Sequence, residues 1–344
     1  MSKDYDKSKI QKALVLTKAG YMGDTIVATP FLRALNGYLT GAEVTLLSGE
    51  MIPVLLQGCP YVSKYIALAK SETKGLGASL KLASKLKSAH FDIAYLLDRS
   101  FRSAFIAKIA GVPVRVGFDT EHRGALLTHR IPYNWNIPER DSLLSLLGIN
   151  SQNDMNMPEL WLSDTEREEA IRRLNSVGMS PGTRPIVAIH SGAHDPEIRE
   201  WGAYKYARVG DWLIENKKAR IILMGSPEEV PSAHAVEIMM RKPCVSFAGK
   251  TNIRQALGLI AACDLWIGND GGMLHAAVAL GTPTVGIFTP AKAKRWGYDS
   301  PKHKTLTHGD PSFSRKPSDM RAALDAITVQ EAQEAAEAIM RIKN

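Results

Sequence analysis

The amino-acid sequence predicts an α/β protein in two halves, each built on a parallel sheet. Short apolar runs alternate with amphipathic, helix-like segments, which is the pattern of βαβ units. A length of 344 residues exceeds one ordinary domain. The alternation restarts after "MSPGTRP" (179–185), whose prolines and glycine are typical of a linker. We therefore expect a first domain at 1–180, a second at 181–326 and a terminal helix at 327–344.

In the first half, apolar runs bounded by loops predict the strands, and segments with a helical apolar period predict the helices. A glycine ends two of these helices, at Gly111 and Gly178. The expected strands are 13–18, 43–49 and 91–98, and the expected helices are 24–39, 100–111 and 162–178.

The second half repeats the pattern with more strands. Its last segment has a good helix start, because Thr328 and Glu331 have the spacing of a capping box. The expected strands are 186–192, 219–225, 244–249, 265–268 and 283–288, and the expected helices are 205–217, 252–263 and 328–342.

Charge and composition limit the class of protein. The net charge is +8, and residues 64–130 hold 12 Lys/Arg against 5 Asp/Glu. Such a concentration suits an anionic partner, although a merely solvated face gives the same pattern. No apolar run is long enough for a transmembrane helix, and the N-terminus lacks the apolar core of a secretory signal. Three cysteines without metal-ligand spacing favour a reducing, cytoplasmic compartment.

The first motif is "TKAGYMGDTI" (17–26), a strand end, a glycine-containing loop and an acid at a helix start. Asp24 could simply cap this helix. It could also be an ionised carboxylate at the carboxyl edge of a sheet, where open α/β folds bind ligands, and then act as a general base. Neither the dinucleotide fingerprint G-x-G-x-x-G nor a P-loop occurs, which disfavours both of those classes.

The second motif, "AIHSGAHDPEIREW" (188–201), is a strand followed by a small-residue loop. Ser191 and Gly192 would let backbone N–H groups approach a phosphate, and Arg199 could clamp a diphosphate. His190 and His194 are four residues apart, but no acid completes a zinc pattern, so a metal site is disfavoured.

Two further motifs end strands of the second half. In "ILMGSPEEV", Glu228 and Glu229 could accept hydrogen bonds from a ribose or simply begin a helix. In "NDGGMLHAAVALGTP", Asp270 and two glycines precede a helix whose free N–H groups form an anion site. His275, one turn further on, either binds a ligand or packs in the core.

These pieces, in this order, resemble glycosyltransferase family 9, the ADP-heptose:lipopolysaccharide heptosyltransferases. The resemblance covers most of the chain, and the D-x-G-x-x-H element followed by A-x-G-T-P is specific when paired with the N-terminal M-G-D. It is carried by "KAGYMGDTIVATPFLRALN", "IHSGAHDPEIREWGAYKYARVGDWL", "ILMGSPEE", "FAGKTNIRQALGLIAACDLWIGNDGGMLHAAVALGTPTVGIFTP" and "RWGY", with "VPVRVGFD" and "LLTHRIP" in the first half.

The resemblance implies a GT-B architecture, two Rossmann-like domains with parallel sheets facing across a cleft. The first domain would bind the acceptor and the second the nucleotide sugar, with the last helix packing back toward the first domain. Asp24 and Arg199 are the expected catalytic residues. Expected donor contacts are Ser191, Gly192, Arg199, Glu228, Glu229, Gly249, Thr251, Asp270, Gly271, Gly272 and His275, and expected acceptor contacts are Gly23, Asp98, Arg99, Arg102 and Arg123.

Two positions depart from the family pattern. Arg199 stands where the family often has lysine, so a planar guanidinium with several donors replaces a compact ammonium group. Gly271 stands where a hydroxyl residue is usual, which leaves backbone alone to bind phosphate there. Both changes bear on the identity of the donor sugar more than on the reaction type.

The expected reaction is inverting, metal-independent transfer of a sugar, heptose from ADP-heptose by resemblance, with no cofactor. Asp24 would deprotonate the acceptor, while Arg199 and the helix after Gly271 stabilise the leaving diphosphate. The expected acceptor is an anionic lipopolysaccharide-type glycolipid. The segment 74–90 could contact the inner membrane surface, or it could simply cover the sheet.

Four alternatives compete with this expectation. A nucleotide-sugar epimerase of the same fold would need no acceptor, and a transferase of the same family could use another donor. A binding protein that has lost catalysis is disfavoured because Asp24, Arg199, Asp270 and His275 are all retained. A nucleic-acid binder is disfavoured because no aromatic-rich basic motif occurs.

Overall fold

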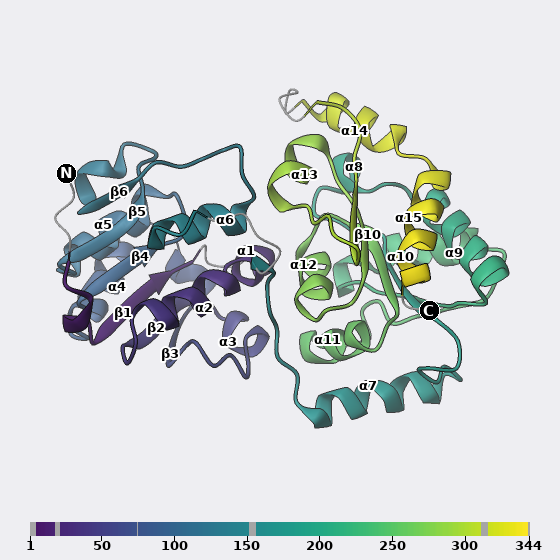
Figure 1. The fold of residues 1–344 in the computed structure, drawn as a ribbon, viewed down its shortest axis with the longest axis horizontal. Helices are drawn as coiled ribbons and strands as arrows, with labels where there is room; N and C mark the ends of the chain where they lie inside the picture. The colour runs from purple at the N-terminus through teal and green to yellow at the C-terminus, as the bar shows by residue number, and fades with distance from the viewer. Residues whose placement is uncertain (1–4, 18–20, 74, 151–155, 311–315, 343–344) are drawn as a thin grey trace. The chain divides into compact units, whose positions relative to one another are not determined.

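In a computed structural model, the chain forms two α/β units, Met1–Leu160 and Trp161–Asn344, each containing a six-stranded parallel sheet (Figure 1). The structure describes residues 5–17, 21–73, 75–150, 156–310 and 316–342. The predicted fold class, α/β with parallel sheets in two Rossmann-like halves, is confirmed. Within the described ranges, every helix is too short or too polar to span a bilayer.

The first sheet has the order β3-β2-β1-β4-β5-β6. The chain moves outward from β1 to β3 and then returns to β4 on the other side of β1, so the strand order reverses between β1 and β4. In open α/β sheets this switch point is where ligands bind, beyond the carboxyl ends of the strands. The strands are β1 (Lys12–Leu16), β2 (Glu43–Gly49), β3 (Lys64–Leu68), β4 (Ile93–Leu96), β5 (Val114–Phe118) and β6 (His129–Ile131).

Helices cover both faces of this sheet. On one face, α4 and α5 pack against alternate residues of the strands, including Leu14 and Leu96. On the other, Phe31 of α2 contacts the ring of Tyr95 edge-on at 5.5 Å. The helices are α1 (Met22–Val27), α2 (Thr29–Tyr38), α3 (Ile52–Leu55), α4 (Leu76–Lys87), α5 (Phe101–Ile109) and α6 (Glu139–Leu144).

The helix expected at 24–39 is two helices, broken at Ala28. Pro30 has no N–H and cannot donate to the carbonyl of Ile26, four residues earlier. The hydroxyl of Thr29 donates to that carbonyl instead, at 2.8 Å. The break therefore follows from proline chemistry and leaves no orphaned acceptor at Ile26.

The second sheet has the order β12-β11-β10-β7-β8-β9, with its switch point between β7 and β10. The expected strands of this half are all present, with ends shifted by a few residues. They are β7 (Ile186–His190), β8 (Arg220–Leu223), β9 (Cys244–Ser246), β10 (Leu265–Asn269), β11 (Thr284–Ile287) and β12 (His303–Leu306).

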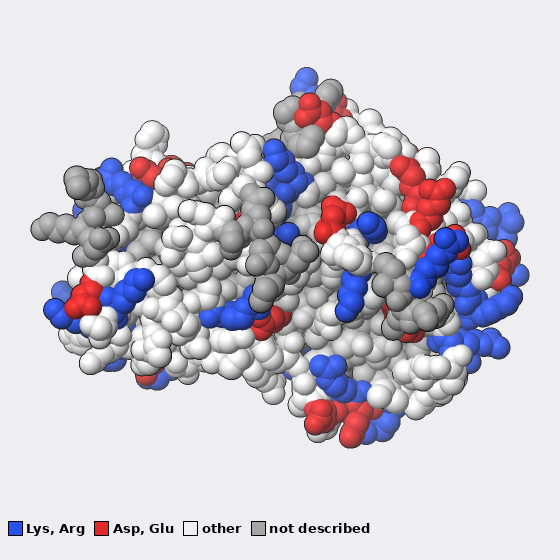
Figure 2. Space-filling view, in the orientation of Figure 1, with Lys and Arg blue, Asp and Glu red and all other residues white. Residues whose placement is uncertain are grey.

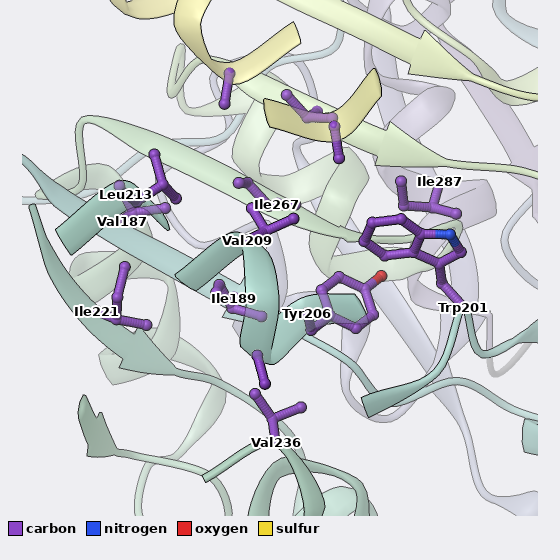
Figure 3. Close-up of a cluster of buried hydrophobic side chains, with 14 of the residues drawn as sticks. Val187, Ile189, Trp201, Tyr206, Val209, Leu213, Ile221, Val236, Ile267 and Ile287 are labelled. Atoms are coloured by element: carbon purple, nitrogen blue, oxygen red, sulfur yellow. The ribbon is translucent and has the colours of Figure 1, made fainter. Parts of the chain in front are cut away.

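The helices of the second unit also form two layers. One face of the sheet packs against α9, α10 and α15 around the rings of Trp201 and Tyr206 (Figure 3). The other face packs against α7, α11 and α12. The helices are α7 (Asp164–Ser176), α8 (Pro196–Arg199), α9 (Ala203–Lys217), α10 (Val230–Met239), α11 (Ile253–Ala261), α12 (Gly272–Ala279), α13 (Pro290–Trp296), α14 (Pro317–Ala326) and α15 (Val329–Ile342).

The division between the units lies at Leu160/Trp161, earlier than the expected 180/181. The charged helix α7 belongs to the second unit because its apolar stripe, Ala170 and Leu174, packs in that unit's core. Its outer face carries intermingled acidic and basic side chains, seen along α7 at the lower edge of Figure 2, with two ion pairs at i, i+4 spacing. The proline-rich stretch therefore joins α7 to β7 and does not separate domains.

The terminal helix α15 packs in the core of the second unit. The predicted capping box is confirmed, since Thr328 and Glu331 exchange hydrogen bonds. Its buried residues, Ala332, Ala336 and Ile339, complete the second unit's own core beside α9. Its apolar face is thus used within the second unit, and the packing toward the first unit that the resemblance implies stays a prediction.

Candidate functional site

The carboxyl ends of β7 and β10 are tied together by Asn269, the buried last residue of β10. Its Oδ1 accepts from the N–H of Trp201 at 3.1 Å and from the hydroxyl of Tyr206 at 2.7 Å. Its Nδ2 donates to the carbonyl of Ser191 at 2.6 Å. Asn269 therefore fixes both ends of the loop 191–201. Sequence reasoning missed it, although a polar residue closing the apolar run "LWIGN" was the available signal.

Gly192 is required by the close approach of Glu229. A Cβ at position 192 would lie 2.7 Å from the Cβ and Cγ of Glu229. The Glu229 carboxylate accepts from the N–H of Ser226 at 2.7 Å and lies 3.1 Å from Nε2 of His190. The loop after β7 and the loop after β8 therefore meet at this glycine.

The two adjacent acids predicted after β8 have different surroundings. Burial raises the pKa of Glu229, but the hydrogen bond and charge of His190 and the N–H of Ser226 outweigh it and lower the pKa overall. Glu229 is therefore ionised near neutral pH, and its hydrogen bonds hold its carboxylate in place at the edge of the site. Glu228 is exposed, and hydrogen bonds to its own backbone N–H and to Ser226 lower its pKa.

Arg199 is held at the switch point by Asp270. Its Nη2 donates to Oδ2 of Asp270 at 2.8 Å and to the Asp270 carbonyl at 3.3 Å. Asp270 directly follows β10, and its own N–H donates to the carbonyl of Ile287 at 2.9 Å. Within the described residues, the hydrogen bonds of Arg199 use Nη2, which leaves Nη1 and Nε available to a ligand.

The helix α12 begins beside this ion pair. The N–H groups of Leu274 and His275 donate to the carbonyl of Gly271 at 3.1 and 3.3 Å, so helical bonding begins there. Among the described residues, the N–H groups of Gly272 and Met273 precede this bonding and are the unsatisfied donors of a helix N-terminus. Together with Arg199 they form an anion-binding arrangement.

Gly271 is not required by the backbone or by crowding. Its φ of −177° and ψ of 174° describe an extended conformation that any residue adopts. A Cβ there would have its nearest neighbour, the carbonyl oxygen of Asn269, at 3.9 Å. A side chain therefore fits at 271, and the missing hydroxyl is a feature of the sequence that the fold does not impose.

His275 is buried, as expected of a core residue, and its role in binding a ligand stays a prediction. Its Nδ1 is 2.9 Å from the hydroxyl of Tyr298, and its ring packs against Trp296 at 5.8 Å. Its Nε2 lies 4.0 Å from Oδ1 of Asp270. The His275 ring therefore packs in the core and also lies next to Asp270, the residue that pairs with Arg199.

Gly249 closes the same edge of the sheet at the loop after β9. Its φ is +70°, a conformation that favours glycine, and its N–H donates to the carbonyl of Gly225 at 3.0 Å. Thr251 follows two residues later and is half-buried. Of the predicted donor residues, Ser191, Gly192, Arg199, Glu228, Glu229, Gly249, Thr251, Asp270, Gly271, Gly272 and His275 all follow the carboxyl ends of β7 to β10.

In the first unit, Asp24 lies inside the first turn of α1. Tyr21 is the N-cap residue and makes no side-chain capping bond, so Asp24 is not the cap. Gly23 and Asp24 are both half-buried. Negative charge in a first helical turn is stabilised by the helix dipole. Residues 18–20 of the motif lie outside the described residues.

Arg123 pairs with the half-buried Asp98, and its complete burial corrects its expected role as an acceptor contact, while the expected role of Asp98 stays a prediction. The Arg123 side chain is fully buried and lies 3.3 Å from the Asp98 carboxylate. It also donates to the carbonyls of Phe118 and Asp98 at 2.8 and 2.7 Å. Burial raises the pKa of Asp98 despite the opposing influence of Ser103 and Arg123. The guanidinium is therefore used to hold loops beyond β4 and β5.

Arg99 and Arg102 have separate environments. Arg99 lies against the rings of Tyr133 and Trp135, 4.4 and 5.0 Å from their centroids, and donates to Tyr133. Arg102 donates to the hydroxyl of Ser79 at 2.9 Å and so joins α5 to α4. Arg99 also pairs with Glu139 at 3.4 Å, and the expected acceptor roles of Arg99 and Arg102 stay predictions. Sequence reasoning missed the aromatic pair, whose signal was "PYNWN".

His190 and His194 are not a metal pair. His190 is buried against Glu229 and stacks on Trp266, whereas His194 is almost fully exposed. Across the part of the chain that the structure describes, no three His, Cys, Asp or Glu side chains gather where they could hold a metal ion.

Comparison with known proteins identifies the relatives of this chain. The model of glycosyltransferase family 9 (heptosyltransferase) matches residues 79–319, which confirms the resemblance seen in the motifs. Lipopolysaccharide heptosyltransferase 2 of Escherichia coli K12 is 28% identical over 284 residues, covering 79% of this chain and 81% of that protein.

Two solved structures share the fold. ADP-heptose lipopolysaccharide heptosyltransferase II of E. coli is 24% identical with a TM-score of 0.77, covering 97% of this chain and 99% of that one. A glycosyltransferase family 9 protein of Veillonella parvula is 19% identical with a TM-score of 0.81, covering 98% of this chain and 99% of that one. These neighbours bear out the GT-B fold class.

Proposed function

Because the chain belongs to glycosyltransferase family 9, the heptosyltransferases, and is therefore a glycosyltransferase, we propose that it transfers heptose from ADP-heptose to an anionic lipopolysaccharide inner-core or related acceptor. The names of the relatives support this donor and acceptor, since they describe ADP-heptose and lipopolysaccharide heptosyltransferases. Three free thiols suit the cytoplasmic location that we propose with it, at the inner face of the membrane.

The main support for the proposal is the hydrogen-bonded ion pair of Arg199 and Asp270, which lies beside the start of α12. A diphosphate leaving group gains negative charge as its bond to the anomeric carbon breaks. A guanidinium and a helix N-terminus aimed at the same place stabilise that charge. We propose that this pair performs the task that a divalent metal performs in other transferases, so that no metal is required.

The step that we propose is a single displacement with inversion. The Asp24 carboxylate takes the proton of the acceptor hydroxyl, and the oxygen forms a bond to the anomeric carbon. The bond from that carbon to the diphosphate breaks on the opposite side, and its electrons leave with ADP. Arg199 and the first N–H groups of α12 stabilise the negative charge that develops on the diphosphate.

The deciding experiment incubates the protein with ADP-heptose and a heptose-less lipopolysaccharide in excess chelator. Transfer with inverted anomeric configuration is expected, and calorimetry should rank ADP above UDP, GDP and CDP. Activity that needs added magnesium or manganese would refute metal independence. Conversion of the donor without any acceptor would instead establish an epimerase.

A transferase of this family with a different donor sugar is the second candidate, and Gly271 favours it. The space around that residue would accept a side chain, so the hydroxyl usual in the family is absent without a structural cause. Competition between ADP-heptose and other ADP-sugars, measured on the same acceptor, separates the two candidates.

A further inference from the structure

Two helices of the first unit each expose an apolar stripe in addition to the stripe they bury. On α4, Leu76 and Leu80 are 67% and 45% exposed and lie one turn apart. On α5, Phe101 and Ile109 are 48% and 45% exposed, two turns apart, with Phe105 between them and stacked on Phe101 at 6.4 Å. A contiguous exposed apolar surface on a globular protein marks an interaction site.

The two stripes belong to one surface, here named the α4–α5 surface. Both helices cover the same face of the first sheet, since residues of each pack in one core cluster with β1 and β4. They are joined by the hydrogen bond from Arg102 to Ser79. Leu80 directly follows Ser79 and Phe101 directly precedes Arg102, so this bond joins the two helices next to a residue of each stripe.

Every charged side chain within α4 and α5 is a lysine or an arginine, and an acid lies at the edge of the surface, where Glu121 accepts from the N–H of Phe101 at 3.4 Å. Lys81, Lys85 and Lys87 of α4 and Lys108 of α5 are exposed, and neither helix contains an aspartate or glutamate. Apolar side chains surrounded by lysines are the composition of helices that lie in a membrane interface, where the apolar groups enter the acyl boundary and the lysines meet anionic headgroups. A nucleic acid would pair with the lysines but not with leucine and isoleucine.

We propose that the α4–α5 surface docks on an anionic lipid bilayer. Both helices begin where β3 and β4 end, at the sheet edge that also carries Asp24 and Arg99. If the acceptor is a glycolipid, as the proposed function requires, docking here presents its headgroup to that edge. The bilayer binding itself depends only on the surface and is measured without turnover.

The test is co-sedimentation of the full chain with vesicles of phosphatidylcholine or of an equal mixture with phosphatidylglycerol. Leu76→Ser with Phe101→Ser removes the apolar stripe, and Lys81→Gln with Lys85→Gln removes charge. The matched controls on the second unit are Ile238→Ser with Met239→Ser, which are 66% and 46% exposed, and Lys302→Gln with Lys304→Gln. Unchanged thermal midpoints confirm that each variant is folded.

Binding to the anionic vesicles alone is expected, weakened about tenfold by either α4–α5 variant and unchanged in both controls. Equal binding to neutral and anionic vesicles would overturn the proposal. An equal loss of binding in the control variants would also overturn it. Transfer to an acceptor in vesicles should fall in the α4–α5 variants, while transfer to a deacylated acceptor should not. Failure of all transfer would refute the proposed function and leave the vesicle result standing.

Discussion

Asp270 positions Arg199 through a hydrogen bond of 2.8 Å from Nη2, which joins the end of the single-turn helix α8 to the residue that follows β10. The side chains of both residues are largely buried, so little water competes for the contact. The pair links the two loops that flank the switch point of the second sheet. A cation on a short loop thereby acquires a fixed place beside the N-terminus of α12.

Arg199→Ala is expected to lower turnover by about a hundredfold or more, because a charged donor to the leaving group is lost. Asp270→Asn should lower turnover less, about tenfold, because the guanidinium remains but is no longer anchored by a carboxylate. Steady-state kinetics with both substrates varied would measure these effects. Arg172→Ala, which removes an exposed arginine of α7 outside the predicted site, serves as the control. Equal losses in control and Arg199→Ala would contradict the role.

Asp24→Ala should lower turnover by about a hundredfold to ten-thousandfold, the range of a general base. Donor affinity should stay near that of the parent, since Asp24 belongs to the first unit and the predicted donor residues to the second. Calorimetric titration with ADP and single-turnover rates would separate the two quantities. Near-normal turnover in the variant would remove Asp24 from the reaction.

The sequence predicts most of the second unit because its strands are short apolar runs bounded by loops with strong turn residues. The strand ends at Leu223 and Asn269 lie within two residues of the expected ends for this reason. The domain boundary was predicted wrongly because prolines and glycine indicate a bend equally well between domains and between α7 and β7. Only the burial of Ala170 and Leu174 distinguishes the two cases.

The site is less predictable than the fold because residue type does not reveal burial. Arg123 and Arg99 look alike in sequence, yet one is enclosed by carbonyls and the other lies on aromatic rings. Asn269 was missed because its three partners come from segments about 60 to 80 residues away in the chain. Such contacts arise from strand order, which local patterns do not contain.

The two glycines at 192 and 271 should respond differently to substitution. Gly192→Ala places a methyl group 2.7 Å from Glu229, so the loops must shift at a cost of about 1–3 kcal/mol. Gly271→Ser meets no neighbour closer than 3.9 Å and should leave stability unchanged or raise it by a few tenths of a kcal/mol, as serine is a good N-cap. Denaturant unfolding of both variants gives the comparison. A destabilised Gly271→Ser protein would show that the site is tighter than the structure indicates.

The second unit should lose an ion pair as the pH falls below the ordinary range of glutamate. Hydrogen bonds from Arg254, the largest influence, and from the Ser163 N–H lower the pKa of Glu166 from 4.5 to about 2. Because the folded pKa is depressed, the stabilisation is fully present above 4.5 and is lost as the pH falls through about 2. The pair joins α7 to α11 with side chains that are 11% and 20% exposed, and the remaining contact with solvent limits its contribution to about 1 kcal/mol.

Glu166→Gln keeps the capping geometry of α7 but removes this charge. The difference in unfolding free energy between parent and variant should be about 1 kcal/mol at pH 6 and shrink toward zero near pH 2. Glu168→Gln, which breaks an exposed pair on the same helix, is the control and should change stability by less. A parent–variant difference that stays constant across this range would show that the Arg254 contact does not stabilise the charged form of Glu166.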